Sequence, residues 1–193
     1  MRTGQMMEVV MNSRLKTIFL IALAIMIFGE SKSQEIYNFS TQSNPEDWFV
    51  VDDRVMGGRS QGRMQVTQDG HAIFEGKVSL ENNGGFSSVR YRLDKMSTSG
   101  NSVFKIRVKG DKKNYQFRVK SSPSERQSYV YEFSTSDQWE VIEIPFKDMY
   151  PSFRGTILAM PNYPGQQLQE CSFLISNKKN ESFRLEIDRI WME

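Results

Sequence analysis

Apolar and polar side chains alternate along much of this chain, and that period of two limits the folds it can adopt. Phe104, Ile106 and Val108 alternate with basic residues in the clearest example. Such alternation places successive side chains on opposite faces of a β-strand. About nine short strand candidates occur, and no long helical stripe does. They lie at 63–67, 72–79, 86–92, 104–109, 115–120, 129–133, 139–144, 171–176 and 183–187. The pattern predicts an all-β fold, a two-sheet antiparallel β-sandwich of jelly-roll type.

The segment from Gly110 to Lys113 separates the two most regular strands and is typical of a hairpin turn. A hairpin there would bring five basic side chains onto one sheet face. These are Lys105, Arg107, Lys109, Arg118 and Lys120. The face is either a solvated surface or a surface for an anionic partner. We favour the solvated surface, because acidic residues elsewhere cancel the charge.

The charge of the chain argues against a nucleic-acid partner. Residues 34–193 contain 21 Lys or Arg and 21 Asp or Glu, so they are formally neutral. The excess of +2 comes from residues 1–33. Because binding to DNA or RNA depends on neutralising phosphates, we expect no nucleic-acid partner.

The N-terminal segment has the order of a secretory signal. Arg14 and Lys16 precede an apolar run at 18–28, and Ser31-Lys32-Ser33 follows it. We therefore predict a signal peptide over 1–33, with Met11 as a possible true start, and one domain over 34–193. The protein would be exported, with no stable membrane insertion after cleavage. The alternative is a membrane anchor at 18–28, although a span needs about 20 apolar residues.

One cysteine and one histidine restrict the chemistry of the chain. Cys171 cannot form an internal disulfide, and together with His71 it makes no zinc-ligand set. We interpret Cys171 as a buried residue of a strand. No phosphate loop, dinucleotide fingerprint or serine elbow is present, so we predict no cofactor and no catalytic residues.

Three segments differ from ordinary strand or turn sequence. The first runs from Trp48 to Ser60 and contains Asp53-Arg54-Val55-Met56-Gly57-Gly58-Arg59-Ser60. The second runs from Phe74 to Arg90 and contains Asn82-Asn83-Gly84-Gly85-Phe86. The third is Val108-Lys109-Gly110-Asp111, followed by Tyr115. In these segments the chain resembles the complex I intermediate-associated protein 30 family, which carries the same motifs in the same order. The resemblance extends over about residues 45–192, with Trp139, Pro145-Phe146, Arg154-Gly155 and the 183–190 strand.

The resemblance implies a galactose-binding-like jelly roll, related in shape to carbohydrate-binding modules. Mitochondrial members of the family act as assembly chaperones for respiratory complex I. It therefore implies a non-catalytic, protein-binding assembly factor. This chain differs in carrying an export signal where a mitochondrial member has a transit peptide.

The polar and glycine residues of these motifs are the candidate residues for binding a ligand or partner. They are Asp52, Asp53, Arg54, Met56, Gly57, Gly58, Arg59, Asn82, Asn83, Gly84, Gly85, Arg90, Asp111 and Tyr115. The glycines either turn tight corners or let a ligand approach the backbone. The carboxylates and amides cap turns and are also of the type that binds Ca²⁺. No spacing matches a known calcium loop, so we predict no metal site.

Two alternatives to protein binding remain open at this stage. A carbohydrate-binding module would stack sugars on exposed aromatic rings. The candidates are Trp48, Tyr115, Tyr129, Trp139 and Tyr163, of which we expect Tyr163 to be the most exposed. A polysaccharide hydrolase would need two facing carboxylates, for which the candidates are Asp53, Glu75, Glu81 and Asp111.

Overall fold

A computed structural model describes residues 33–193 of the protein. The predicted signal peptide lies almost entirely outside this range, so the signal and the alternative anchor stay predictions. Within the described range, no helix has both the length and the apolar character needed to cross a membrane.

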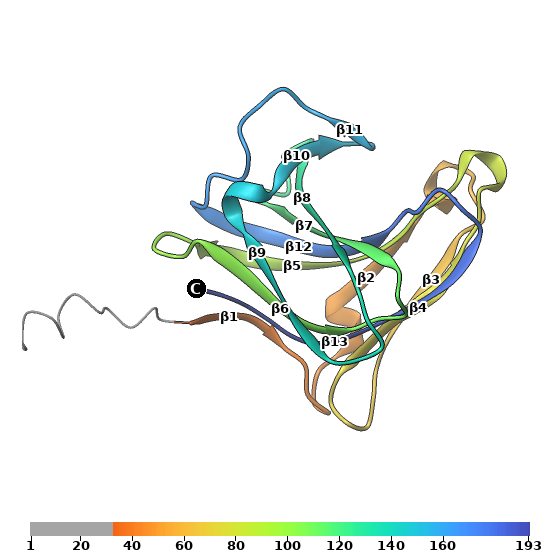
Figure 1. Cartoon of the computed structure of the whole chain (residues 1–193), viewed down its shortest axis with the longest axis horizontal. Coiled ribbons are helices and arrows are strands. Elements are labelled where there is room, and N and C mark those ends of the chain that lie inside the picture. Colours follow the sequence, from red (N-terminus) through yellow and green to blue (C-terminus); the bar gives the residue numbers. More distant parts are fainter. Residues whose placement is uncertain (1–32) are drawn as a thin grey trace, which may run out of the picture. The chain divides into compact units, whose positions relative to one another are not determined.

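The strands of residues 33–193 form two antiparallel sheets, shown in Figure 1. The six-stranded sheet has the order β3 (Gln61–Val66), β4 (Ala72–Val78), β13 (Glu181–Met192), β6 (Val103–Lys109), β9 (Glu140–Pro145), with β1 (Gln34–Asn38) also paired to β13. The seven-stranded sheet has the order β11 (Thr156–Ile157), β10 (Tyr150–Phe153), β8 (Ser128–Ser134), β7 (Asn114–Lys120), β12 (Gln167–Ile175), β5 (Ser87–Ser97), β2 (Trp48–Asp52). Within the described residues, four short 3₁₀ turns connect strands: η1 (Pro45–Asp47), η2 (Asp53–Met56), η3 (Glu81–Asn83) and η4 (Phe146–Asp148).

The core lies between the two sheets and is built from the apolar half of each alternating strand. Phe104 and Ile106 of β6 are fully buried, as are Phe117 of β7 and Phe173 of β12. The rings of Phe104 and Phe117, which belong to different sheets, meet across the layers with their centroids 5.7 Å apart. The prediction of an all-β, two-sheet antiparallel sandwich is confirmed.

The predicted hairpin between residues 104–109 and 115–120 is wrong. Strand β6 pairs with β13 and β9 in one sheet, whereas β7 pairs with β12 and β8 in the other. The turn at Gly110 therefore crosses between sheets. It is fixed from outside, since the Gly110 N–H donates to the carbonyl of Ser136 at 2.9 Å. The five basic residues consequently divide between two separate surfaces.

Candidate functional site

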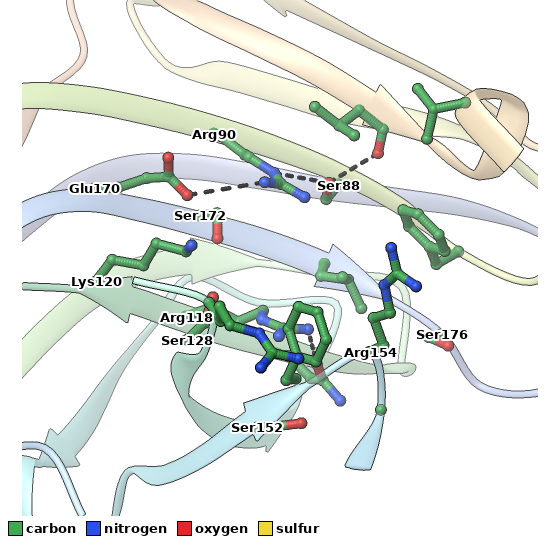
Figure 2. Close-up of a pocket in the computed structure, with 18 of the residues that line it drawn as sticks. Ser88, Arg90, Arg118, Lys120, Ser128, Ser152, Arg154, Glu170, Ser172 and Ser176 are labelled. Atoms are coloured by element: carbon green, nitrogen blue, oxygen red, sulfur yellow. Dashed lines mark hydrogen bonds and ion pairs between the residues drawn. The ribbon is translucent and has the colours of Figure 1, made fainter. Parts of the chain in front are cut away.

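A hollow lies on the outer face of the seven-stranded sheet, opposite the core. Its volume is about 510 Å³, within the range of ~300–1,000 Å³ usual for ligand sites. Its polar lining comes from five neighbouring strands, in which outward side chains share one face. The lining includes Ser88 and Arg90 of β5, Glu170 and Ser172 of β12, Gln116, Arg118 and Lys120 of β7, Ser128 of β8 and Ser152 of β10. We call this hollow the groove; Figure 2 shows its side chains.

The floor of the groove holds two cations from β7. Arg118 is half-buried, and its guanidinium donates a hydrogen bond to Oε1 of Gln116 at 3.3 Å. Burial, together with the nearby Arg90, lowers the pKa of Arg118 to about 10. Burial also lowers the pKa of Lys120, opposed in part by Glu170. Both cations therefore occupy positions where the charged form is less well solvated than in water.

One carboxylate lines the groove, and it is paired with two arginines. Glu170 of β12 is 4% exposed. Its Oε2 atom accepts a hydrogen bond from Nε of Arg92 at 3.1 Å, and its Oε1 atom lies 3.9 Å from a guanidinium nitrogen of Arg90. Glu170 therefore compensates Arg90 and Arg92, and neither Arg118 nor Lys120 forms an ion pair with it within 4.0 Å.

A third pair of cations flanks a phenyl ring at the edge of the groove. The guanidinium carbons of Arg126 and Arg154 lie 4.7 and 5.3 Å from the centroid of Phe153. Arg154 and Gly155 form the two-residue connection between β10 and β11, with φ values of 50° and 79°. Such values suit a tight hairpin turn in which Asn-Gly is the preferred pair. An arginine in this position points a charge toward the groove at some cost in backbone strain.

The rim near η2 is apolar and exposed. Val55 and Met56 belong to the groove lining, and 75% and 59% of their surfaces are accessible. They lie at the turn of the first glycine motif, where Gly57 adopts a left-handed φ of 92° and ends η2. The groove thus has a cationic floor and an apolar rim.

Asp53 holds that rim in place from beneath. Its side chain is fully buried and accepts hydrogen bonds from the backbone N–H groups of Ser60 at 2.9 Å, Gly85 at 2.6 Å and Phe86 at 3.2 Å, and from the Ser60 hydroxyl. Burial by itself raises the pKa of Asp53, but these bonds outweigh it and hold the pKa below its ordinary value. One carboxylate therefore fastens the first glycine motif to the second.

Further bonds reinforce this connection between the two glycine motifs, which we call the joint. The side-chain amide of Asn82 donates to the carbonyl of Gly57 at 3.1 Å, and Arg59 pairs with Glu81 at 3.2 Å on the surface. Asp52 accepts from the Gly62 N–H at 3.1 Å and the Ser87 hydroxyl at 2.6 Å. Most candidate residues predicted from the sequence therefore gather at this joint. They are Asp52, Asp53, Arg54, Met56, Gly57, Gly58, Arg59, Asn82, Asn83, Gly84 and Gly85.

The other three candidates lie apart from the joint. Arg90 lies in the groove itself. Asp111 belongs to the β6–β7 crossing, where it accepts hydrogen bonds from the Tyr115 hydroxyl and the Arg184 backbone N–H, both at 2.9 Å. Tyr115 is 1% exposed, and burial raises its pKa well above the usual range. Among the candidates, Met56 and Arg90 line the groove, whereas Asp111 and Tyr115 join the crossing to β13.

The aromatic residues considered for sugar stacking are mostly in the core. Trp48, Tyr115, Tyr129 and Tyr163 are at most 5% exposed. The expectation that Tyr163 is exposed is wrong, because its ring packs 5.1 Å from that of Phe146 and its hydroxyl donates to the Gln167 carbonyl at 2.8 Å. The Pro-rich loop around Tyr163 folds inward over the core. Trp139 is partly exposed, in contact with Arg107 outside the groove.

The carboxylates considered for hydrolysis each have local partners. Asp53 is buried in the joint, Glu75 pairs with Arg63 and Arg184, and Glu81 pairs with Arg59. Among residues 33–193, His, Cys, Asp and Glu side chains nowhere gather in threes as a metal site requires. Cys171 is fully buried, as expected from its strand, and burial raises the pKa of its thiol.

The groove was not predicted from the sequence as a site, although four of its five cations, Arg90, Arg118, Lys120 and Arg154, were noted there. The sequence favours a solvated face for Arg118 and Lys120, because acidic residues elsewhere cancel the charge, and the expected hairpin places them beside the paired cations of β6. A useful signal was Glu170 and Ser172, two polar residues beside the apolar residues of the central strand β12. Polar residues in a central strand indicate a second, functional face. The serines Ser88, Ser128 and Ser152 carry no sequence signal of their own.

Comparisons with known proteins agree with this fold. The sequence pattern of the family described as Complex I intermediate-associated protein 30 (CIA30) matches residues 37–187. No curated protein matches the sequence. A family 11 carbohydrate-binding module from Clostridium thermocellum, solved with a β-1,3-1,4-mixed-linked tetrasaccharide, is similar in structure, with a TM-score of 0.59 and 14% identity over 83% of this chain and 94% of that one.

Two further solved structures are similar. The family 11 module of the cellulosomal cellulase Lic26A-Cel5E of Clostridium thermocellum has a TM-score of 0.59 and 18% identity, covering 83% of this chain and 93% of that one. An exo-β-agarase has a TM-score of 0.54 and 5% identity, covering 82% of this chain and 25% of the enzyme. At these identities the likeness establishes the fold, a sandwich shared with carbohydrate-binding modules.

Proposed function

This chain belongs to the Complex I intermediate-associated protein 30 family, and we propose that it is a non-catalytic module that binds a partner protein in its groove. The observation that carries the proposal is the pairing of a cationic floor with the exposed apolar rim at Val55 and Met56. Exposed apolar side chains beside polar groups are typical of a protein-binding surface.

The glycine motifs support this role by fixing the rim. Asp53 ties both motifs together beneath η2, so Val55 and Met56 remain at the surface instead of folding into the core. A rim that is ordered before binding loses less conformational entropy when the partner arrives. Methionine also adapts its shape to different partner side chains. The motifs would thus serve binding indirectly, as the support of a recognition loop.

The absence of facing carboxylates in the groove supports a non-catalytic role. Among the described lining residues, Glu170 is the single carboxylate, and it is paired with Arg90 and Arg92. A glycosidase needs two carboxylates, one of them available as a proton donor. Glu170 alone meets neither requirement.

Site-specific crosslinking in the native cells tests the proposal. A photoreactive amino acid is placed at Met56, with a matched placement at Val141, which is 48% exposed on β9 of the other sheet. We expect a discrete protein adduct from Met56, no such adduct from Val141, and loss of the adduct when Ser128→Tyr fills the groove. Equal adducts from both positions, or none from Met56, would contradict protein binding at the groove.

A carbohydrate ligand is the second candidate, favoured by the hydroxyl and guanidinium donors of the groove and by the shared sandwich fold. Phe153 would be the stacking ring, since the rings first considered are largely buried. Affinity electrophoresis in mixed-linked β-glucan and agarose tests this candidate. Retardation that Phe153→Ala removes would support it, whereas unretarded migration in both polysaccharides would exclude these ligands.

We also propose that the protein is exported. The basis is the apolar run at 18–28 with its basic flank and small residues at 31–33. N-terminal sequencing of the protein from native cells should begin at Gln34. A blocked or intact N-terminus upstream of residue 18 in a membrane fraction would favour the anchor instead.

A further inference from the structure

We propose that the occupant of the groove is an acidic segment of the partner protein, carrying carboxylates that reach Arg118 and an apolar side chain that packs on Val55 and Met56. The inference rests on the proposed function and gives its partner a chemistry. It follows from three features of the groove: unpaired cations, an under-bonded guanidinium in the floor, and an aliphatic rim.

The cations of the groove differ from Lys105 and Arg107, the corresponding strand cations of the other sheet. On the six-stranded sheet, Lys105 lies 3.1 Å from Glu143 and 2.8 Å from Glu193, and Arg107 lies 2.8 Å from Asp188. In the groove, four cations form no ion pair within 4.0 Å with any described carboxylate. They are Arg118, Lys120, Arg126 and Arg154. Because residues 34–193 are neutral overall, the fold concentrates uncompensated positive charge at this surface.

Arg118 is the residue best placed to bind a carboxylate. A guanidinium has five N–H donors in a planar fork that matches a carboxylate in two parallel bonds. The guanidinium donates one hydrogen bond to a described side chain, to Gln116 at 3.3 Å, so donors remain for a ligand. Partial burial strengthens such a pair, because fewer water molecules compete for it. Gln116 is itself held by Glu132 at 2.9 Å, which fixes one side of the arginine.

The other cations surround the same space. Figure 2 shows Arg90 of β5, Arg118 and Lys120 of β7, and Arg154 of the β10–β11 turn around the same opening. Lys120 is oriented by a hydrogen bond to the Glu125 carbonyl at 2.5 Å, and Phe153 positions Arg154. A ligand with several negative charges can therefore meet more than one cation at once. A single carboxylate would use only part of this arrangement.

The rim favours a peptide over an anionic glycan. Sugars stack on flat aromatic faces, whereas Val55 and Met56 present rounded aliphatic surface. Val51, Phe86 and Leu174 continue this apolar end inside the groove. Leucine, isoleucine or phenylalanine of a peptide suits such a surface, and charged residues beside it suit the floor. An acidic peptide with an apolar anchor matches both ends.

Peptide titration of the full chain tests the inference. The probe is a fluorescein-labelled peptide of Leu-Phe followed by eight glutamates, and its control has eight glutamines. We expect the glutamate peptide to bind at least about tenfold more tightly, and the difference to shrink as salt is added. Equal affinities for the two peptides would overturn the proposal.

Two variants locate the charge contact. Arg118→Gln should weaken binding of the glutamate peptide about tenfold, as expected for loss of a charge-assisted pair. Arg154→Asn should weaken it about threefold while keeping a residue that suits the turn. Lys77→Gln, on β4 of the other sheet, is the matched control and should change affinity less than twofold. An unchanged affinity in both groove variants would overturn the inference.

Competition distinguishes the possible sources of the negative charge. Polygalacturonate that displaces the peptide at a lower carboxylate concentration than free polyglutamate would make a glycan the occupant and overturn the proposal. The Met56 crosslink separates this inference from the proposed function. If the Met56 probe gives the same adduct yield when Arg118→Gln is added, protein binding is kept but the acidic segment is rejected. If the Met56 probe gives no protein adduct when Arg118 is intact, both proposals are rejected.

Discussion

The Oδ2 atom of Asp53 accepts a hydrogen bond at 2.6 Å from the backbone N–H of Gly85, a residue 32 positions away, and so joins the two glycine motifs. The same carboxylate accepts from Phe86 and Ser60, so four donors converge on one buried anion. Each loop contributes N–H groups that no strand partner satisfies. At this end of the sandwich, the side chain of Asp53 therefore accepts the backbone hydrogen bonds that a neighbouring strand would otherwise accept.

Asp53→Asn should destabilise the fold by about 3 kcal/mol. An amide keeps the size of the carboxylate but replaces one acceptor oxygen with an NH₂ donor. In the wild-type chain, Oδ2 accepts hydrogen bonds from backbone N–H groups, and an NH₂ group in its place would face those donors without bonding to them. Urea unfolding followed by tryptophan fluorescence measures the change. Asp94→Asn, an exposed position on β5, is the control and should change stability by less than about 0.5 kcal/mol. Equal losses of unfolding free energy in both variants would show that the joint does not contribute to stability.

The stability of the wild-type chain should decrease as pH falls below about 4. The folded pKa of Asp53 is held below its ordinary value, so its contribution is complete above the unfolded pKa. It is lost as pH falls through the folded pKa. Ser60→Ala removes the side-chain donor that contributes most to lowering this pKa, so this variant should show a shallower acid loss. Urea midpoints between pH 7 and pH 3 provide the comparison, and parallel curves would contradict it.

Two glycines of the joint should respond differently to alanine. A Cβ on Gly84 would lie 2.6 Å from Oδ2 of Asp53 and 2.8 Å from the Ser79 carbonyl oxygen, so Gly84→Ala should cost about 3 kcal/mol. A Cβ on Gly57 would meet no heavy atom within 4 Å. Gly57→Ala should cost only about 1 kcal/mol, for its φ of 92°. Thermal unfolding of both variants measures which one is less stable. A larger loss of stability in Gly57→Ala than in Gly84→Ala would contradict the close packing at Gly84.

The sandwich was predictable from the sequence because its cause is local. Alternation in residues 104–109 and 115–120 reports directly which side chains face the core, and the structure buries Phe104, Ile106, Phe117 and Val119 as expected. Which strands pair is decided by distant residues. The Gly110 turn would fit a hairpin by composition, but Ser136 and Asp111 anchor it as a crossing between sheets.

The groove was hidden for the same reason. Arg107 and Arg118 look alike in sequence, each a basic residue between apolar neighbours in a strand. Arg107 meets Asp188 on β13, whereas Arg118 faces Arg90 across strand β12. Only the strand order tells a compensated cation from an uncompensated one. The glycine motifs were visible in the sequence, but their support of the Val55–Met56 rim needs the fold.

Replacing each of these two arginines by methionine should shift stability in opposite directions. Arg118→Met removes a poorly solvated cation that has no carboxylate partner, and it should stabilise the fold by about 1 kcal/mol. Arg107→Met removes the pair with Asp188 and the contact with the Trp139 ring at 4.8 Å, and it should cost about 1 kcal/mol. Urea unfolding at low salt compares the two. A gain of stability on losing Arg118, together with loss of acidic-peptide binding, is expected of a residue kept for function. Destabilisation by Arg118→Met would instead make that cation a structural element of the sheet, and the case for an acidic ligand would lose its central residue.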